Sequence, residues 1–308
     1  MSAALRSHYN ILYLWLVLTG ISGYNLIGIP VILIYIFTIL IRNKSETKKV
    51  HKKLCSNNRH QGNSFYDKET SSKAIEDSLP LSPQKNLTIP HTIDTSQILK
   101  NLHYVEKNKF QYASDIVTRI VADATGTAWL DYFDLLKSRF DWVYTHSINV
   151  AVISVMMAAE LGYHKMDLEC IALGGLLHDV GKLLIPTSII QKDSSLDDMQ
   201  MELMRKHSEL GMSLVAICGL SDDCNAMILQ HHERLDGCGY PYGLKSDNIH
   251  AYAKIAMLAD VLDAITSHRP YRPGKSVSVA IQIIKDEGPK FAAECVSVIE
   301  KLLCERPT

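Results

Sequence analysis

Histidines and aspartates occur between residues 178 and 260 in an order that suits a pair of metal ions. HDVGK begins at His178, a lone His207 follows, HHERLDGCGYP begins at His231, and Asp260 comes later. Two divalent ions about 3.5–4 Å apart need ligands from several elements, some of which bridge both ions. Asp179 has two oxygens for such a bridge, and His178 offers a neutral imidazole. This mixture suits iron, manganese or zinc better than calcium or magnesium, so the pattern predicts a metal-dependent enzyme.

Helices must bring these side chains together. Neighbouring helical residues diverge by about 100°, so His231 and His232 need a helix end to reach one pocket, and the glycines of GCGYP supply the exit. Gly174 and Gly175 would let another helix approach closely beneath HDVGK. Apolar spacing predicts a helix over 148–159 whose first turn carries His146. A capping pair, Ser195 with Asp198, predicts the start of a helix that runs through 207–215. Further helices are expected over 166–177, 222–232, 250–266, 277–286 and 291–303.

The ordered motifs resemble the HD-GYP family, the branch of HD-superfamily metal phosphohydrolases associated with cyclic di-GMP breakdown in bacteria. Beyond HDVGK and HHERLDGCGYP, the resemblance rests on YTHSINVAV at 144–152, KHSELG at 206–211 and ADVLDAITSHRPYR at 259–272. It covers roughly residues 96–308, with a helical lead-in over 96–140. The resemblance implies an all-α, HD-superfamily helical bundle around a binuclear metal centre.

Site residues follow from the resemblance position by position. The implied metal ligands are His146, His178, Asp179, His207, His231, His232 and Asp260. Lys182 and Asp179 are the implied catalytic residues, with Lys182 contacting substrate phosphate. The implied substrate contacts are Arg269, Arg272, Tyr240 and Gly239. Two alternatives stay open, because Tyr240 would also serve as a structural wedge and the arginines would also brace the helix that ends near Ser267.

One position departs from the family pattern. Relatives that resemble a three-metal version have Glu four residues before the first ligand histidine, whereas this chain has Trp142 there, with Asp141 one residue further off. An indole supplies no oxygen ligand, so the expectation is two divalent ions per chain, iron or manganese. Asp263, one turn after Asp260, is either a hydrogen-bond partner of a ligand or a buried structural carboxylate.

The resemblance implies metal-assisted hydrolysis of cyclic di-GMP to linear pGpG, with water as nucleophile, and leaves open whether pGpG is cut again to GMP. Two alternatives differ in class: a non-catalytic cyclic di-GMP receptor or interaction module, and a hydrolase of another cyclic dinucleotide or nucleotide. The retained ligand set argues against the receptor. Other expected partners are proteins that bind the GYP loop, and a second copy in a homodimer.

Composition limits the other classes of protein. The chain has 308 residues and a net charge of −1, without a long basic stripe, which argues against binding a nucleic-acid polymer. Its seven cysteines are single, without a CxxC pair, which is typical of reduced thiols in a cytoplasmic domain.

The N-terminal part predicts a membrane anchor. Residues 11–41 carry no charge, enough for one tilted transmembrane helix across a hydrocarbon core of about 30 Å. A hairpin turning within 20–30 is the alternative. Lysines and arginine crowd residues 42–53, whereas residues 1–10 hold one arginine, so the catalytic part should face the cytoplasm of a bacterial inner membrane. The basic cluster would also suit anionic lipid, and residues 42–95 read as a polar, flexible linker.

Overall fold

The computed structural model describes residues 93–95, 98, 102, 105–268 and 273–303, which belong to one compact unit. Within them the chain is helical, without a strand and with one isolated bridge between Asp236 and Lys245. The all-α prediction is confirmed. The longer helices are α4 Lys107–Asp123, α5 Ala128–Arg139, α6 Asp141–Glu160, α7 Lys165–Leu177, α9 Asp198–Arg205, α10 His207–Val215, α11 Asp222–Gln230, α12 Ala251–Thr266, α13 Val277–Asp286 and α14 Ala293–Leu303.

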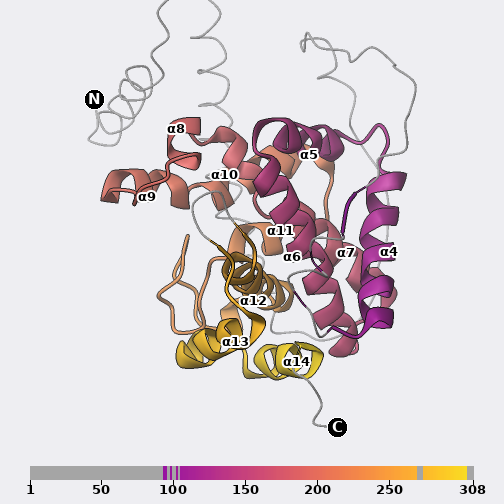
Figure 1. The fold of residues 1–308 in the computed structure, drawn as a ribbon. Coiled ribbons are helices and arrows are strands. Elements are labelled where there is room, and N and C mark those ends of the chain that lie inside the picture. Colours follow the sequence, from indigo (N-terminus) through magenta and orange to yellow (C-terminus); the bar gives the residue numbers. More distant parts are fainter. Residues whose placement is uncertain (1–92, 96–97, 99–101, 103–104, 269–272, 304–308) are drawn as a thin grey trace, which may run out of the picture. The chain divides into compact units, whose positions relative to one another are not determined.

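The α6 helix is the centre of the bundle (Figure 1). It packs against α4, α5, α7, α12 and α14, and its apolar side chains are buried on all sides rather than along one stripe. Among the described residues it is the one helix long and apolar enough to cross a membrane, and 83% of its most apolar window is buried inside the protein. Its hydrophobicity therefore has a sufficient explanation in the core.

Two glycines allow α7 to approach its neighbours closely. A Cβ on Gly175 would lie 2.6 Å from Cα of Ala151 in α6, and one on Gly174 would lie 2.5 Å from Sδ of Met227 in α11. Both distances are far below van der Waals contact, so larger residues would push these helices apart. The predicted close approach beneath HDVGK is confirmed, and it holds the end of α7 firmly between α6 and α11.

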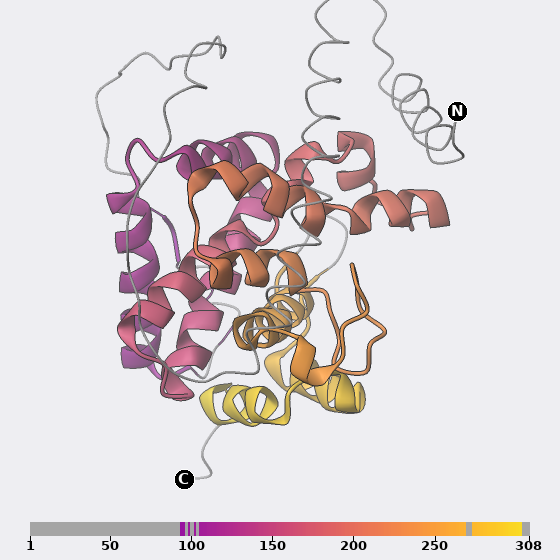
Figure 2. The same ribbon diagram turned by 180° about the vertical axis from the view of Figure 1, so that it is seen from behind.

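The C-terminal helices close one end of the bundle. The α12 helix packs on α6, α11 and α13, and α14 contacts α6, α12 and α13. Seen from behind, the short helices at 187–205 form one edge of the molecule, on the same side as the loop between α11 and α12 (Figure 2). This loop carries the GYP sequence.

The structure corrects three details of the predicted helices. The predicted cap with Ser195 is wrong, because Asp197 accepts from the backbone N–H of Gln200 at 2.9 Å and caps α9. The predicted continuous helix through 215 is broken at Lys206, between α9 and α10. His146 lies in the second turn, not the first, because α6 already begins at Asp141.

The predicted N-terminal segment 1–10, transmembrane helix 11–41 and nearly all of linker 42–95 lie outside the described residues, as do Arg269 and Arg272.

Candidate metal centre

The predicted ligands lie at helix ends and in two helix interiors. The C-cap residue of α7 is His178, and Asp179 follows as the N-cap of a 3-10 helix over Val180–Leu184. The first residue of α10 is His207, while His231 ends α11 and His232 follows it. The helix end predicted for the His231–His232 pair is therefore confirmed. The remaining two ligands, His146 and Asp260, lie within α6 and α12.

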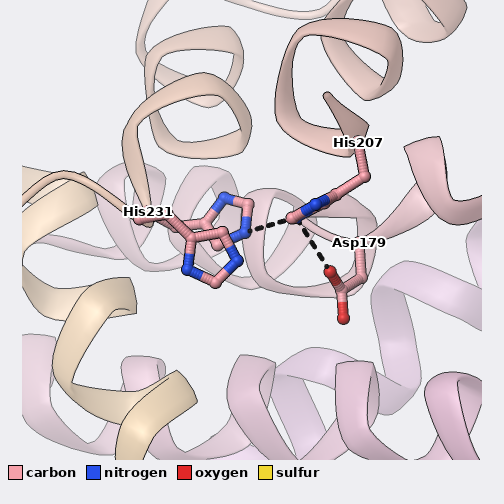
Figure 3. A group of neighbouring side chains, drawn as sticks. Asp179, His207 and His231 are labelled. Atoms are coloured by element: carbon pink, nitrogen blue, oxygen red, sulfur yellow. Dashed lines mark hydrogen bonds and ion pairs between the residues drawn. The ribbon is translucent and has the colours of Figure 1, made fainter. Parts of the chain in front are cut away.

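The fold brings all seven residues together in two groups. Asp179, His207, His231 and His232 form one group, and His146, His178 and Asp260 form the other; within each, the ligand atoms lie within 4.8 Å of one another. In Figure 3, His207 lies between Asp179 and His231, and a dashed line joins it to each of them.

Asp179 lies between the two groups. Its Oδ1 is 3.3 Å from Nε2 of His207, whereas its Oδ2 is 3.4 Å from Nε2 of His178 and 3.7 Å from Nε2 of His146. The two oxygens of one carboxylate thus face different groups. This is the arrangement that a bridging ligand requires.

Three histidines are oriented by backbone carbonyl groups about one helical turn earlier in the chain. The Nδ1 atoms of His178, His207 and His231 donate to the carbonyl oxygens of the residues three positions earlier, at 2.7, 2.7 and 2.8 Å. A carbonyl only accepts, so the proton is on Nδ1 and the lone pair on Nε2. Such outer hydrogen bonds are typical of histidines that bind metal.

Unpaired acceptors face the interior of the site. The Nε2 atoms of His207 and His231 lie 3.2 Å apart, and both carry lone pairs if Nδ1 holds the proton. Nε2 of His178 and Oδ1 of Asp179 are buried without a hydrogen-bond partner. Buried acceptors that face one another are costly unless a cation lies between them. The nitrogen and oxygen donors therefore fit divalent metal ions.

Burial sets the protonation states of this centre. It lowers the pKa of His207 to about 4 and the pKa values of His231 and His232 well below their ordinary range. For Asp179, burial acts to raise the pKa, but the positive charge of Lys182 and the contact with His178 outweigh it and lower the pKa well below the usual value. Neutral imidazoles beside an ionised carboxylate are the forms that bind metal.

The carboxylate of Asp263 is the hydrogen-bond partner of a ligand, which decides between the two sequence-based alternatives. Its Oδ2 accepts from Nδ1 of His146 at 2.6 Å, and its Oδ1 accepts from Asn149 and Ser267, each at 2.7 Å. Burial lowers the pKa of His146, but hydrogen bonds to Asp260 and Asp263 outweigh it and raise the pKa to about 9. Asp263 therefore fixes the ring and makes it more basic.

We expect Asp263→Asn to lower metal affinity about tenfold to a hundredfold, the usual effect of changing a residue that orients a metal-binding histidine. The amide keeps the shape but loses the charge. Metal titration with a competing chelator measures the change. The exposed Asp115→Asn on α4 is the matched control, and equal affinity in the two variants would contradict the assignment.

The ammonium of Lys182 is fixed from two sides. Its Nζ lies 2.5 Å from Oδ2 of Asp179 and 5.6 Å from the centre of the Trp142 ring, a cation–π distance. Lys182 thus lies beside Asp179, and its predicted contact with substrate phosphate stays a prediction. The contact with Trp142 was not foreseen, because spacing within the sequence does not reveal which side chain covers an indole.

Buried Glu233 holds the GYP loop, a role that sequence reasoning missed. Its two oxygens accept from the backbone N–H groups of Tyr242 and Leu244, each at 2.8 Å, and the residue is fully buried. Gly239 packs on the backbone of Glu233 and Arg234 so closely that a Cβ would clash. The sequence signal that could have indicated this role is the position of Glu233 between the ligand histidines and the glycines of the loop.

The loop places Tyr240 against the centre. Its ring stacks on His232 with a centroid distance of 4.6 Å and an interplanar angle of 29°. A wedge role and a substrate-side role are both compatible with this position, because the ring is half-buried.

The chain is similar to several known proteins. A 36% identical relative over 174 residues is named a cyclic di-GMP phosphodiesterase of Pseudomonas aeruginosa, with 56% of this chain and 42% of that protein covered. A Vibrio cholerae relative named 3'3'-cGAMP-specific phosphodiesterase 1 is 34% identical, with 50% and 36% covered. The alignments thus span less than half of these relatives.

A solved structure of an HDG"Y"P protein from Bdellovibrio bacteriovorus aligns with a TM-score of 0.47 and 21% identity, covering 68% of this chain and 70% of that one. The model of the HD domain matches residues 132–292, which is more than half of the chain and includes every proposed ligand. The chain belongs to the HD domain family.

Proposed function

We propose that this chain is a metal-dependent phosphodiesterase that hydrolyses cyclic di-GMP to linear pGpG and, by a second cut, to GMP. The observation that carries the proposal is the position of Asp179, whose two oxygens face two separate groups of ligand atoms. The name of the Pseudomonas aeruginosa relative supports the substrate.

The proposed cofactor is a pair of divalent ions, iron or manganese, because histidine-rich sites with carboxylates suit these metals. One group, with Asp179, His207, His231 and His232, would hold the first ion; His146, His178 and Asp260, with the second oxygen of Asp179, would hold the other. Bound there, the ions would supply Lewis-acid polarisation of the phosphoryl group and an activated water.

The protein's own residues have distinct roles in this scheme. Lys182 holds a positive charge beside Asp179, where it would stabilise negative charge that develops on the phosphoryl oxygens. Asp263 keeps His146 oriented. Tyr240 and Gly239, with Arg269 and Arg272, would form the substrate side of the site.

A second candidate substrate has its own support. The Vibrio cholerae relative is named for 3'3'-cGAMP, which differs from cyclic di-GMP in one base, so hydrolysis of another cyclic dinucleotide is the alternative. A non-catalytic receptor has less support, because all seven ligand positions are kept and brought together.

The test is incubation of the full-length chain, prepared anaerobically with iron or manganese, with cyclic di-GMP and 3'3'-cGAMP. Chromatography of the products should show faster release of pGpG than cleavage of 3'3'-cGAMP. Elemental analysis should find two metal ions per chain, because Trp142 offers no oxygen ligand. Intact cyclic di-GMP with a fully loaded centre would refute the proposal, and close to three ions per chain would refute the two-metal assignment.

The substitutions Arg269→Ala and Arg272→Ala should weaken substrate binding while leaving metal content unchanged, because guanidinium groups bind phosphate or guanine rather than metal. Each charge-assisted contact is worth about 1.5–3 kcal/mol, or roughly ten- to more than a hundredfold in affinity. A cyclic di-GMP titration beside a melting curve separates the roles. A lower Tm with unchanged affinity would show that the arginines only brace the preceding helix.

We also propose that residues 11–41 anchor the chain as a single span in a bacterial inner membrane with the catalytic part in the cytoplasm. The uncharged run and the basic residues at 42–53 support this. Binding of proteins to the GYP loop, and homodimer formation, remain proposals of the same kind.

A further inference from the structure

Next to the metal centre is an arginine that the proposed mechanism has not used. Arg205 lies in the last turn of α9, two residues before His207. Its guanidinium carbon is 5.6 Å from the centre of the Tyr240 ring, and Tyr240 in turn stacks on His232. The guanidinium is therefore one aromatic ring away from a proposed metal ligand.

The side chain of Arg205 is available to bind an anion. Its side chain is exposed, and among the described residues no carboxylate lies within ion-pair distance of it. Lys182, by contrast, already contacts Asp179. The guanidinium lies over an aromatic ring, and its N–H groups make no hydrogen bond to another of the described residues.

The charge around it also favours an anion. The carboxylates of Asp179 and Asp260 would neutralise half of the charge of two dications, so the loaded centre would keep a net positive charge. An unpaired guanidinium beside such a centre is repelled unless a negative group lies there too. A cyclic dinucleotide supplies one, because it has a second phosphodiester besides the one under attack.

We infer that Arg205, held over Tyr240, binds the phosphate of a cyclic dinucleotide that is not being cleaved. The inference rests on the proposed function and deepens it. It makes Arg205 a determinant of specificity for substrates with two phosphates, and it gives Tyr240 the role of a platform between this second phosphate and His232.

The test compares three probes in the full-length, metal-loaded chain. Cyclic di-GMP has two phosphates and guanine, the 4-nitrophenyl ester of GMP has one phosphate and guanine, and bis(4-nitrophenyl) phosphate has one phosphate and no base. Affinity for cyclic di-GMP is measured with its non-hydrolysable phosphorothioate analogue, so that binding is read separately from turnover. The matched control is Arg119→Ala, because Arg119 is an exposed arginine on α4 that pairs with Glu169.

The expected result for Arg205→Ala is an affinity for the cyclic di-GMP analogue about tenfold to a hundredfold lower, with metal content and kcat/KM on both single-phosphate probes unchanged. Arg205→Lys should recover part of the affinity, because it keeps the charge but not the planar fork.

Other outcomes overturn the inference in distinct ways. Unchanged affinity in Arg205→Ala removes the residue from the site. An equal loss of affinity for cyclic di-GMP and of kcat/KM on the GMP ester shows that Arg205 binds guanine. A loss on all three probes shows that Arg205 only supports the structure of the centre. A wild-type chain that cleaves bis(4-nitrophenyl) phosphate but neither binds nor cleaves a cyclic dinucleotide refutes the proposed function, and the inference with it.

Discussion

Substituting Asp179→Asn should remove bound metal and lower the rate of cyclic di-GMP cleavage at least about a thousandfold. The amide keeps the shape but offers no second anionic oxygen, so the two ligand groups lose the residue that both share. Stabilisation of phosphoryl charge by metal is worth several kcal/mol, and each ~1.4 kcal/mol is tenfold in rate. His178→Ala should behave in the same way.

Elemental analysis and single-turnover kinetics on the same preparation measure both effects. Asp115→Asn again serves as the control, since it changes an exposed aspartate on α4. Circular dichroism should show that the helices of both variants are kept. Full metal occupancy together with wild-type turnover in Asp179→Asn would remove this carboxylate from the centre.

The substitution Glu233→Ala should destabilise the protein by at least about 2 kcal/mol. It leaves the buried backbone N–H of Leu244 without an acceptor, which costs about 1–3 kcal/mol, and it also removes the acceptor of the partly buried N–H of Tyr242. The loop that carries Tyr240 then loses its attachment, so affinity for cyclic di-GMP should fall as well.

Chemical denaturation gives the change in the free energy of unfolding, and Glu287→Ala supplies the control, because this exposed glutamate pairs only with Lys290 in the described contacts. A variant Glu233→Ala as stable as this control would show that the loop relaxes to solvate its N–H groups and that Glu233 is not its attachment.

Sequence patterns were sufficient to predict which histidines and aspartates lie together, because metal chemistry restricts both residue type and order. All seven predicted ligand residues converge in two groups, and the predicted end of α11 places His231 and His232 together. Helix type was also predictable, since apolar periodicity over α7, α12 and α13 reports burial directly. The exact caps were not: Asp197 replaces Ser195 because both residues are good N-caps and only the packing of α9 chooses between them.

Contacts that join distant parts of the chain were beyond the reach of the patterns. Arg205 meets Tyr240, and Lys182 lies over Trp142, across separate elements. Such pairs depend on how helices and loops pack, which spacing along one helix does not contain. The role of Asp263 could be predicted in part. Its position one turn after Asp260 indicated a possible hydrogen-bond partner of a ligand, and the structure showed that this ligand is His146.

The division of the ligands among five helices makes the metal part of the architecture. His146 lies in α6, His207 is the first residue of α10, and Asp260 lies in α12. His178 and His231 are the C-cap residues of α7 and α11. Each ion would therefore act as a cross-link between segments that are far apart in the chain, and binding energy would become folding energy. At free metal a hundredfold above Kd, this linkage adds about 2.7 kcal/mol to stability. In a cell starved of the metal, the protein would thus be less stable as well as inactive.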